Sequence, residues 1–287
     1  MSNAMLKKEL EMQTWLVTGA SSGFGRTISE EALRRGERVA VTARNPEDVA
    51  DFRERYPETA LPVRLDVTDG ASIAQAVERT SAWAGTLDVV VNNAGYGVHG
   101  AIEEVSDEET RQIFDVNVFG LLRVTRAVLP LMRQQGRGHV VNLSSMGGLV
   151  AGAGSGVYAA TKFAVEGISE ALRAEVAPLG IRVTVSEPGP FRTDFNGRSI
   201  QVARASLPAY ADTAGRRSAA LRSSSGKQPG NPDKAARILC DIVASAEPPF
   251  HLLLGNAAVD RVRPKLTALM EEIARWEEVS RSADGTD

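Results

Sequence analysis

The feature that most limits the fold of this chain is its alternation of short apolar runs with longer amphipathic segments. Seven apolar runs predict strands, at residues 14–17, 38–42, 61–67, 87–91, 140–143, 181–186 and 250–254. Helical patterns separate them, and strands that alternate with helices form parallel sheets. Most runs are continuously apolar, as in strands covered on both faces. The pattern therefore predicts an α/β fold, a Rossmann-type doubly wound parallel sheet with strand order 3-2-1-4-5-6-7.

No linker or internal repeat divides the sequence, so residues 5–287 are expected to form a single domain. Residues 1–4 are interpreted as the remnant of an expression tag. Residues 106–133 carry an apolar pattern at helical spacing and predict the longest helix. Residues 256–281 predict a C-terminal helix that packs on its own domain. The apolar side chains expected to make that contact are Leu266, Leu269, Met270, Ile273 and Trp276.

Composition argues against several classes of protein. The net charge is -3 and like charges form no blocks, so we expect no nucleic-acid partner. No apolar run approaches the roughly 18 residues of a membrane span, so no membrane partner is expected. Cys240 is the only cysteine, which excludes an intrachain disulfide and fits a cytoplasmic protein. His99, His139 and His251 lack the spacing of metal ligands, so no metal site is predicted.

Unusual residues follow the predicted strands. They are the TGASSGFG turn at 18–25, Arg44, Asp66, the NNAG turn at 92–95, Ser145 and the PGPFRT segment at 188–193. The carboxyl ends of parallel strands meet at one edge of a sheet, where α/β proteins bind ligands. The sequence therefore predicts one crevice, built from loops that are distant along the chain.

Glycines in the first of these loops indicate a phosphate-binding turn. Gly19, Gly23 and Gly25 lie between a strand and a helix, where the backbone can approach a pyrophosphate at the helix N-terminus. Their spacing is G-x-x-x-G-x-G, which differs from the common G-x-G-x-x-G fingerprint of dinucleotide sites. An ordinary strand–helix turn is the alternative.

Arg44 indicates which dinucleotide the crevice prefers. NAD-binding folds place an acid after the second strand, whereas an arginine nearby accommodates the 2′-phosphate of NADP. We therefore predict NADP(H) in preference to NAD(H), with a solvated surface arginine as the alternative. Asp66 either caps its own loop or accepts a hydrogen bond from the adenine amino group. Asn93 and Gly95 either contact the adenosine ribose or tie neighbouring strand ends together.

Tyr158 and Lys162 are four residues apart on a predicted helix, so they share one face. Ser145, at the end of the preceding strand, can face both across a glycine-rich loop. A free phenol has a pKa of about 10, and we expect the ammonium and an oxidised nicotinamide ring to lower it. The three groups together predict proton transfer to a carbonyl or from an alcohol, with Ser145 as hydrogen-bond donor to the substrate oxygen. Tyrosine–lysine pairs at this spacing also occur by chance.

Asn117 interrupts the apolar pattern of residues 106–133. Asparagine is unfavourable inside a helix because its amide competes for backbone hydrogen bonds. We interpret it as the site of a local kink whose freed carbonyl holds a water molecule. The alternative is an asparagine that faces solvent.

Taken together, these residues resemble the short-chain dehydrogenase/reductase family in its single-domain, NADP(H)-dependent branch. TGASSGFG matches the family's TGxxxGxG, NNAG is identical, and Ser145, the YxxxK motif and the PGxxxT element follow in family order over residues 14 to about 254. The resemblance implies a catalytic tetrad of Asn117, Ser145, Tyr158 and Lys162. Tyr158 would be the acid/base, Lys162 would lower its pKa and bind ribose, and Asn117 would hold a water that relays protons.

The resemblance also implies a set of cofactor contacts, in which Thr193 would meet the nicotinamide carboxamide. The predicted contacts are Gly19, Ser21, Ser22, Gly23, Phe24, Gly25, Arg44, Asp66, Val67, Asn93, Ala94, Gly95, Tyr158, Lys162, Pro188, Gly189, Phe191 and Thr193. One departure from the family is the absence of a basic residue in the glycine turn, where Ser21 and Ser22 stand. The NADP(H) prediction therefore depends on Arg44 alone.

The sequence thus predicts an oxidoreductase that transfers hydride between NADP(H) and a small-molecule ketone or secondary alcohol. The resemblance further implies a homodimer or homotetramer. Residues 195–230 are expected to be a mobile substrate-binding lid. Its apolar residues favour a hydrophobic substrate; they are Phe195, Ile200, Val202, Leu207 and Tyr210. One alternative is a catalytically silent, NADP(H)-sensing regulatory protein, which intact tetrad positions disfavour. Another is a sugar-nucleotide epimerase, for which the C-terminal part is too short.

Overall fold

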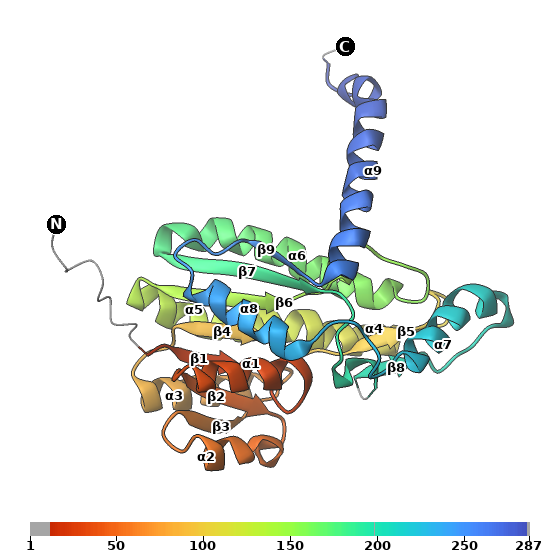
Figure 1. Ribbon diagram of the computed structural model, residues 1–287. Helices are drawn as coiled ribbons and strands as arrows, with labels where there is room; N and C mark the ends of the chain where they lie inside the picture. Colours follow the sequence, from red (N-terminus) through yellow and green to blue (C-terminus); the bar gives the residue numbers. More distant parts are fainter. Residues whose placement is uncertain (1–11, 198, 286–287) are drawn as a thin grey trace.

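The computed structural model describes residues 12–197 and 199–285, so the predicted tag remnant at residues 1–4 lies outside the described part. Seven parallel strands form one twisted sheet in the order β3-β2-β1-β4-β6-β7-β9 (Figure 1). Counted within this sheet, the order is the predicted 3-2-1-4-5-6-7, and the α/β fold is confirmed. The strands are β1 (Thr14–Val17), β2 (Arg38–Ala43), β3 (Ala60–Arg64), β4 (Val89–Asn92), β6 (Gly138–Leu143), β7 (Ile181–Pro188) and β9 (His251–Leu254).

Helices cover both faces of this sheet. The helices of the described chain are α1 (Gly23–Arg34), α2 (Asp51–Arg55), α3 (Gly70–Ala84), α4 (Asp107–Phe114), α5 (Leu121–Gln135), α6 (Gly156–Val176), α7 (Arg216–Ser223), α8 (Pro232–Ala244) and α9 (Asn256–Arg281). Those that cover the sheet are α3, α5 and α6 on one face and α1, α2 and α8 on the other. Alternate residues of each strand point to opposite faces. In β1, Leu16 joins the core beneath α3, α5 and α6, whereas Trp15 and Val17 join the core beneath α1, α2 and α8. Both faces are therefore buried, which explains the continuous apolar runs.

The strand register brings the predicted loops together at one edge. Val17 pairs with Val41 of β2 and Val91 of β4, so the glycine turn, Arg44 and the NNAG turn leave the sheet at the same level. Leu143 pairs with Ser186 across β6 and β7, which places the loops that follow these two strands side by side.

A two-stranded sheet at this edge was not predicted. In it, β5 (Gly97–His99) pairs in parallel with β8 (Ile200–Val202). Residues 195–230 also contain two 3₁₀ turns, a π turn over Ala211–Gly215 and α7. The weak periodicity of this segment reflects elements too short to show a repeat.

Three other expectations are wrong: the single longest helix at residues 106–133, the end of the third strand, and the packing of the C-terminal helix. Residues 106–133 are not one helix, because a π segment over Asp115–Gly120 separates α4 from α5. The longest helix is α9, with 26 residues. The third strand ends at Arg64, since the chain turns where the Asp66 carboxylate accepts hydrogen bonds from Thr68.

The third error concerns the C-terminal helix. It was expected to pack on its own domain, yet Figure 1 shows α9 projecting from the body of the molecule. Its predicted contact residues are exposed: Leu266, Leu269, Met270, Ile273 and Trp276. Only its first two turns bury side chains, Ala258 and Val262. No helix among the described residues is both long and apolar enough to cross a membrane.

Candidate active site

The glycine turn has the backbone conformation that glycine permits. Gly19 and Gly23 adopt φ angles of 66° and 56°, a region that other residues rarely enter. A Cβ on Gly25 would overlap the Asn93 amide and the Gly19 carbonyl. The turn therefore needs glycine at all three predicted positions, two for conformation and one for close packing. It leads into the N-terminus of α1, where free N–H groups favour a phosphate.

The NNAG turn is joined directly to the glycine turn. The Asn93 amide donates hydrogen bonds to the carbonyl oxygens of Thr18 and Gly19, at 2.8 and 3.0 Å. The Thr18 hydroxyl accepts in turn from the backbone N–H groups of Asn93 and Ala94. The tying role considered for Asn93 is therefore present, and it holds two loops of the crevice in a fixed relation.

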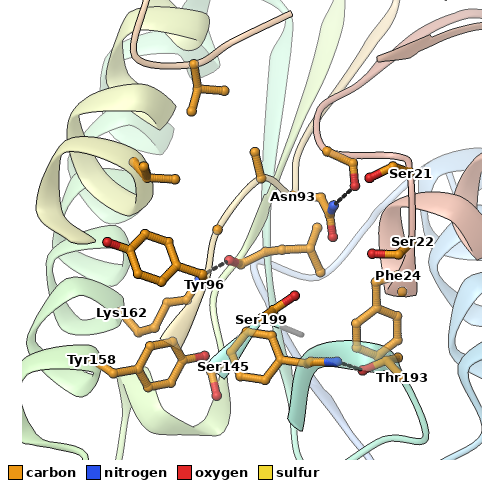
Figure 2. Close-up of a pocket in the computed structure, with 18 of the residues that line it drawn as sticks. Ser21, Ser22, Phe24, Asn93, Tyr96, Ser145, Tyr158, Lys162, Thr193 and Ser199 are labelled. Atoms are coloured by element: carbon orange, nitrogen blue, oxygen red, sulfur yellow. Dashed lines mark hydrogen bonds between the residues drawn. The ribbon is translucent and has the colours of Figure 1, made fainter. Parts of the chain in front are cut away.

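The predicted crevice exists as a pocket of about 600 Å³ at the carboxyl edge of the sheet. Figure 2 shows Ser22, Phe24 and Thr193 on one side of it and Ser145, Tyr158 and Lys162 on another. Of the predicted site residues, all but two line this pocket. Gly25 lies behind the turn, and Asn117 lies behind the wall that Gly95 and Tyr96 form.

Arg44 lies at the end of the pocket that the β2 and β3 loops form. It is exposed and lines the pocket together with Asp66. Burial alone would raise the pKa of Asp66. The Thr68 hydrogen bonds and the Arg44 and Arg64 charges outweigh that effect and hold the pKa below its usual value. This end of the pocket therefore presents a guanidinium beside an ionised carboxylate that also caps its own loop.

Tyr158, Lys162 and Ser145 meet at the other end. Lys162 is buried and donates a hydrogen bond to the Leu143 carbonyl at 2.8 Å. Its Nζ lies 6.0 Å from the centre of the Tyr158 ring. Ser145 Oγ accepts from the Gly147 N–H at 3.0 Å, and Figure 2 shows it beside the Tyr158 hydroxyl. The geometry brings the three groups together in the predicted cleft.

The electrostatics of this end differ from the prediction. Burial raises the pKa of Tyr158 to about 12, although the hydrogen bond with Ser145 opposes the shift. Burial also lowers the pKa of Lys162 to about 8, against the opposing charge of Glu166. The protein side chains therefore keep the phenol protonated at neutral pH. Desolvation thus outweighs any lowering of the phenol pKa by the Lys162 ammonium, while the further lowering expected from an oxidised nicotinamide ring stays a prediction.

Asn117 lies inside the π segment, and its side chain is buried. Its Oδ1 accepts from the Tyr96 N–H at 3.0 Å, and its Nδ2 donates to the Tyr96 carbonyl at 2.9 Å and to Thr161 Oγ1 at 3.1 Å. The helix interruption is confirmed, and the solvent-facing alternative is wrong. Asn117 joins the loop after β4 to α6, one residue from Lys162. π segments inside helices are frequent at functional sites.

The substrate side of the pocket is partly aromatic. The Phe195 ring lies 5.7 Å from the Tyr158 ring, between centroids, and Tyr96 lines the same region. Of the five apolar residues from segment 195–230, only Phe195 lines the pocket. Val202 is exposed, and the Tyr210 hydroxyl donates to Glu103 instead. Ser199 and Gln201 complete this side, so the segment supplies polar groups as well as one ring.

Three titratable residues lie together behind Lys162. Of these, only His251 was considered from the sequence, and only as a metal ligand. Glu187 of β7 is fully buried, and its Oε1 lies 2.6 Å from Nδ1 of His251. Glu166, one turn after Lys162 on α6, has its Oε2 3.9 Å from the same nitrogen. Burial raises the pKa of Glu166 to about 7 and of Glu187 to about 8. The three residues come from elements that are distant along the chain, so no spacing in the sequence connects them. The one visible signal was Glu187, a glutamate inside a strand expected to be buried.

Comparison with known proteins places this chain in a well-populated group. A family model described as short chain dehydrogenase matches residues 13–202. Oxidoreductase BOA17 of Botryotinia fuckeliana is 40% identical over 267 residues, which cover 93% of this chain and 97% of the relative. A 3-ketodihydrosphingosine reductase of Bacteroides thetaiotaomicron is 38% identical over 247 residues, covering 86% of this chain and 89% of the relative.

Solved structures agree with this grouping. The crystal structure of a short-chain dehydrogenase from Streptomyces avermitilis has a TM-score of 0.90 and 44% identity, covering 96% of this chain and 100% of that one. Structures complexed with NADH and with NADP+ match at TM-scores of 0.70 and 0.71 and at 27% and 26% identity. Each covers 84% of this chain. A nicotinamide cofactor is therefore expected in this pocket.

Proposed function

The chain belongs to the short-chain dehydrogenase family and is an oxidoreductase of the CH–OH/C=O class, and we propose that it reduces a hydrophobic ketone with NADPH. The observation that carries this proposal is the shared pocket. A phosphate-binding glycine turn, an arginine and the Ser145–Tyr158–Lys162 group line one continuous space. When bound, the nicotinamide supplies or accepts the hydride. The remaining steps fall to side chains of this protein.

Tyr158 is proposed as the proton donor. Its phenol is protonated at neutral pH, as a phenol with the ordinary pKa of about 10 already is, and burial raises that pKa further. A protonated phenol can act as general acid toward a carbonyl oxygen. Ser145 donates a hydrogen bond to the same oxygen as negative charge develops there. Lys162 orients the site and passes a proton from solvent back to Tyr158 after the phenol has given its own to the substrate oxygen. Asn117 fixes the loop and helix on either side of Lys162.

The substrate class follows from the walls of the pocket beside Tyr158. Phe195 and Tyr96 line this part, and apolar walls favour a ketone with hydrophobic substituents. One relative is named a 3-ketodihydrosphingosine reductase, a name that describes a keto group on a long-chain base. We therefore infer that long-chain ketones are the first candidates, with small secondary alcohols and ketones as the comparison set.

The test is NADPH oxidation against a panel of ketones, in the wild type and in Tyr158→Phe. The phenylalanine variant is expected to lose at least about 10²-fold in kcat, since general acid catalysis contributes about 10²–10⁴-fold. NADPH binding, read from cofactor fluorescence, should persist. Tyr56→Phe, at the end of α2 and outside the pocket, is the matched control. Full activity in Tyr158→Phe would refute the mechanism, and cofactor binding without turnover on every substrate would favour a silent sensor.

The preference for NADPH is proposed from Arg44. Arginine pairs with phosphate through charge-assisted hydrogen bonds worth about 1.5–3 kcal/mol. Arg44→Ala should therefore lower kcat/KM for NADPH about 10- to 100-fold and leave that for NADH nearly unchanged. Arg64→Ala, at the neighbouring strand end and outside the pocket lining, is the control. An unchanged ratio of the two cofactors in Arg44→Ala would refute the assignment.

Two further expectations complete the proposal. We expect the enzyme to work in the cytoplasm, where NADPH is supplied and a lone thiol such as Cys240 stays reduced. We also expect it to act as a homodimer or homotetramer, as family members commonly do. Cell fractionation and sedimentation analysis test these two points.

A further inference from the structure

Helix α9 leaves a row of large apolar side chains without a neighbour. After Val262, which is 1% exposed, the exposures are 44% for Leu266, 42% for Leu269, 54% for Ile273 and 55% for Trp276. Met270 and Val279 beside them are 66% and 60% exposed. Figure 1 shows this part of the helix standing clear of the body. A contiguous apolar row of this size on a soluble protein marks an interaction surface.

The row has the spacing that lets two helices pair. Val259, Val262, Leu266, Leu269, Ile273 and Trp276 follow one another in alternate steps of three and four residues. Side chains at this spacing form one seam along a helix and interlock with the same seam of another helix. The first turns lie on the domain, so the free seam starts at Leu266 and continues to the end of the helix.

Charge indicates which helix fits this seam. Residues 256–268 have a net charge of +2, from the three cations Arg261, Arg263 and Lys265 and the one acid Asp260. Residues 269–281 have a net charge of -2. The four acids are Glu271, Glu272, Glu277 and Glu278, and the two cations are Arg275 and Arg281. A second copy of α9 that runs antiparallel places the basic first half of each helix beside the acidic second half of the other, except at the middle of the pair, where Glu271 and Glu272 lie near their own counterparts. A parallel copy places like charges together.

The seam is also self-complementary in that orientation. A two-fold axis near residue 271 opposes Leu266 to the partner's Trp276 and Leu269 to the partner's Ile273. Arg263 then faces the partner's Glu277. Each contact occurs twice, as an isologous interface requires. The acidic outer half of α9 is unsuited to an anionic lipid surface, which attracts basic helices.

We propose that α9 is a self-association helix, which pairs antiparallel with α9 of a second copy through Leu266, Leu269, Ile273 and Trp276. This inference does not depend on the proposed function. It assigns the exposed row to a specific occupant, a second copy of the same chain.

The first test is the mass of the full-length protein by sedimentation equilibrium over a dilution series. The wild type should self-associate, and Leu269→Asp/Ile273→Asp should halve the mass at the same concentration while NADPH binding and circular dichroism stay unchanged. Thr267→Asp/Ala274→Asp adds the same charges on the exposed side of the same helix and should leave the mass unchanged. A wild type that is monomeric, or an unchanged mass in the seam variant, would overturn the proposal. Loss of binding to neutral or anionic vesicles in that variant, with no change in mass, would overturn it in favour of lipid.

The second test addresses orientation. Met270 lies beside the seam close to the proposed two-fold axis, so Met270→Cys should form a disulfide-linked dimer under mild oxidation. Cys240 is buried and gives little background. Thr267→Cys, which faces away from the seam, is the matched control and should stay uncrosslinked. Equal crosslinking of the two variants would overturn the antiparallel arrangement.

Discussion

Helices α6 and α9 each carry a row of side chains at the same helical spacing, and the chain covers the row on α6 and not the one on α9. On α6, Lys162, Val165, Ser169, Leu172 and Val176 follow one another in steps of three and four, and all are buried. On α9 the equivalent row is exposed beyond Val262. The spacing of apolar residues therefore shows which side chains share a face of a helix. It does not show what lies against that face.

The two rows differ in the kind of residue they contain. The row on α6 includes Ser169, whose hydroxyl accepts a hydrogen bond at 2.8 Å from the Asn142 amide of β6. It also includes Lys162, bound to the Leu143 carbonyl of the same strand. These polar side chains need defined partners once buried, and β6 supplies them. The row on α9 is wholly apolar, so it needs only a complementary apolar surface, which a second copy can provide.

The largest expected contrast between the helices is catalytic. Lys162→Met removes a buried ammonium beside Tyr158, and we expect kcat to fall about 10²–10⁴-fold. Lys265→Met makes the same change on α9, where the ammonium lies over the Phe163 ring outside the pocket, and should leave kcat within about two-fold. Steady-state kinetics with NADPH measure both. A Lys162→Met enzyme with more than a tenth of the wild-type kcat would remove the functional distinction between the helices.

The second contrast is in stability. Leu172 on α6 is 6% exposed and Leu269 on α9 is 42% exposed. Leu172→Ala should lower the free energy of unfolding by about 2–5 kcal/mol, because it leaves a cavity in the core. Leu269→Ala should lower that of the monomer by less than about 1 kcal/mol. Urea unfolding at a chain concentration that dissociates oligomers measures both. Equal losses would show that something in the same chain covers α9.

The sheet and the crevice could be predicted because local signals determine them. A buried parallel strand is a continuous apolar run, and Gly19 and Gly23 occupy positions that glycine favours. The loops that follow such strands must meet at one edge, so Arg44, Asp66, Asn93 and Ser145 were placed in one pocket without any knowledge of contacts between them. Which loops meet at the ligand-binding edge of a parallel sheet follows from the topology of the sheet alone.

The errors concern properties that depend on contacts between distant parts. The pKa of Tyr158 depends on how deeply it is buried, which the YxxxK spacing does not encode. The three residues of β8 become a strand only because β5 lies beside them. Glu166, Glu187 and His251 meet because α6, β7 and β9 are neighbours in space. The solvent exposure of α9 likewise depends on what the rest of the chain fails to cover.

The smallest expected difference is in how the acids near the two helices make the stability depend on pH. Glu166 on α6 and Glu187 beneath it are close to His251, and burial raises their pKa values to about 7 and about 8. Glu278 on α9 is exposed. An acid whose pKa is higher in the native state than in the unfolded chain binds protons more tightly when folded. Its contribution to stability is complete below pH 4.5 and is lost as the pH rises to about 8.

Glu187→Gln removes one of these titrations and keeps the shape of the side chain. Between pH 5 and pH 9 the variant should therefore lose less stability than the wild type, by on the order of 1–3 kcal/mol. Urea unfolding at pH 5, 7 and 9 gives the difference. Buried His99 and His139, whose pKa values burial lowers to about 4 and about 3, act in the opposite direction, but they are common to both proteins and cancel. Glu278→Gln should follow the wild-type profile. A Glu187→Gln profile parallel to the wild type would mean that the acids behind α6 are no more constrained than those on the free surface of α9.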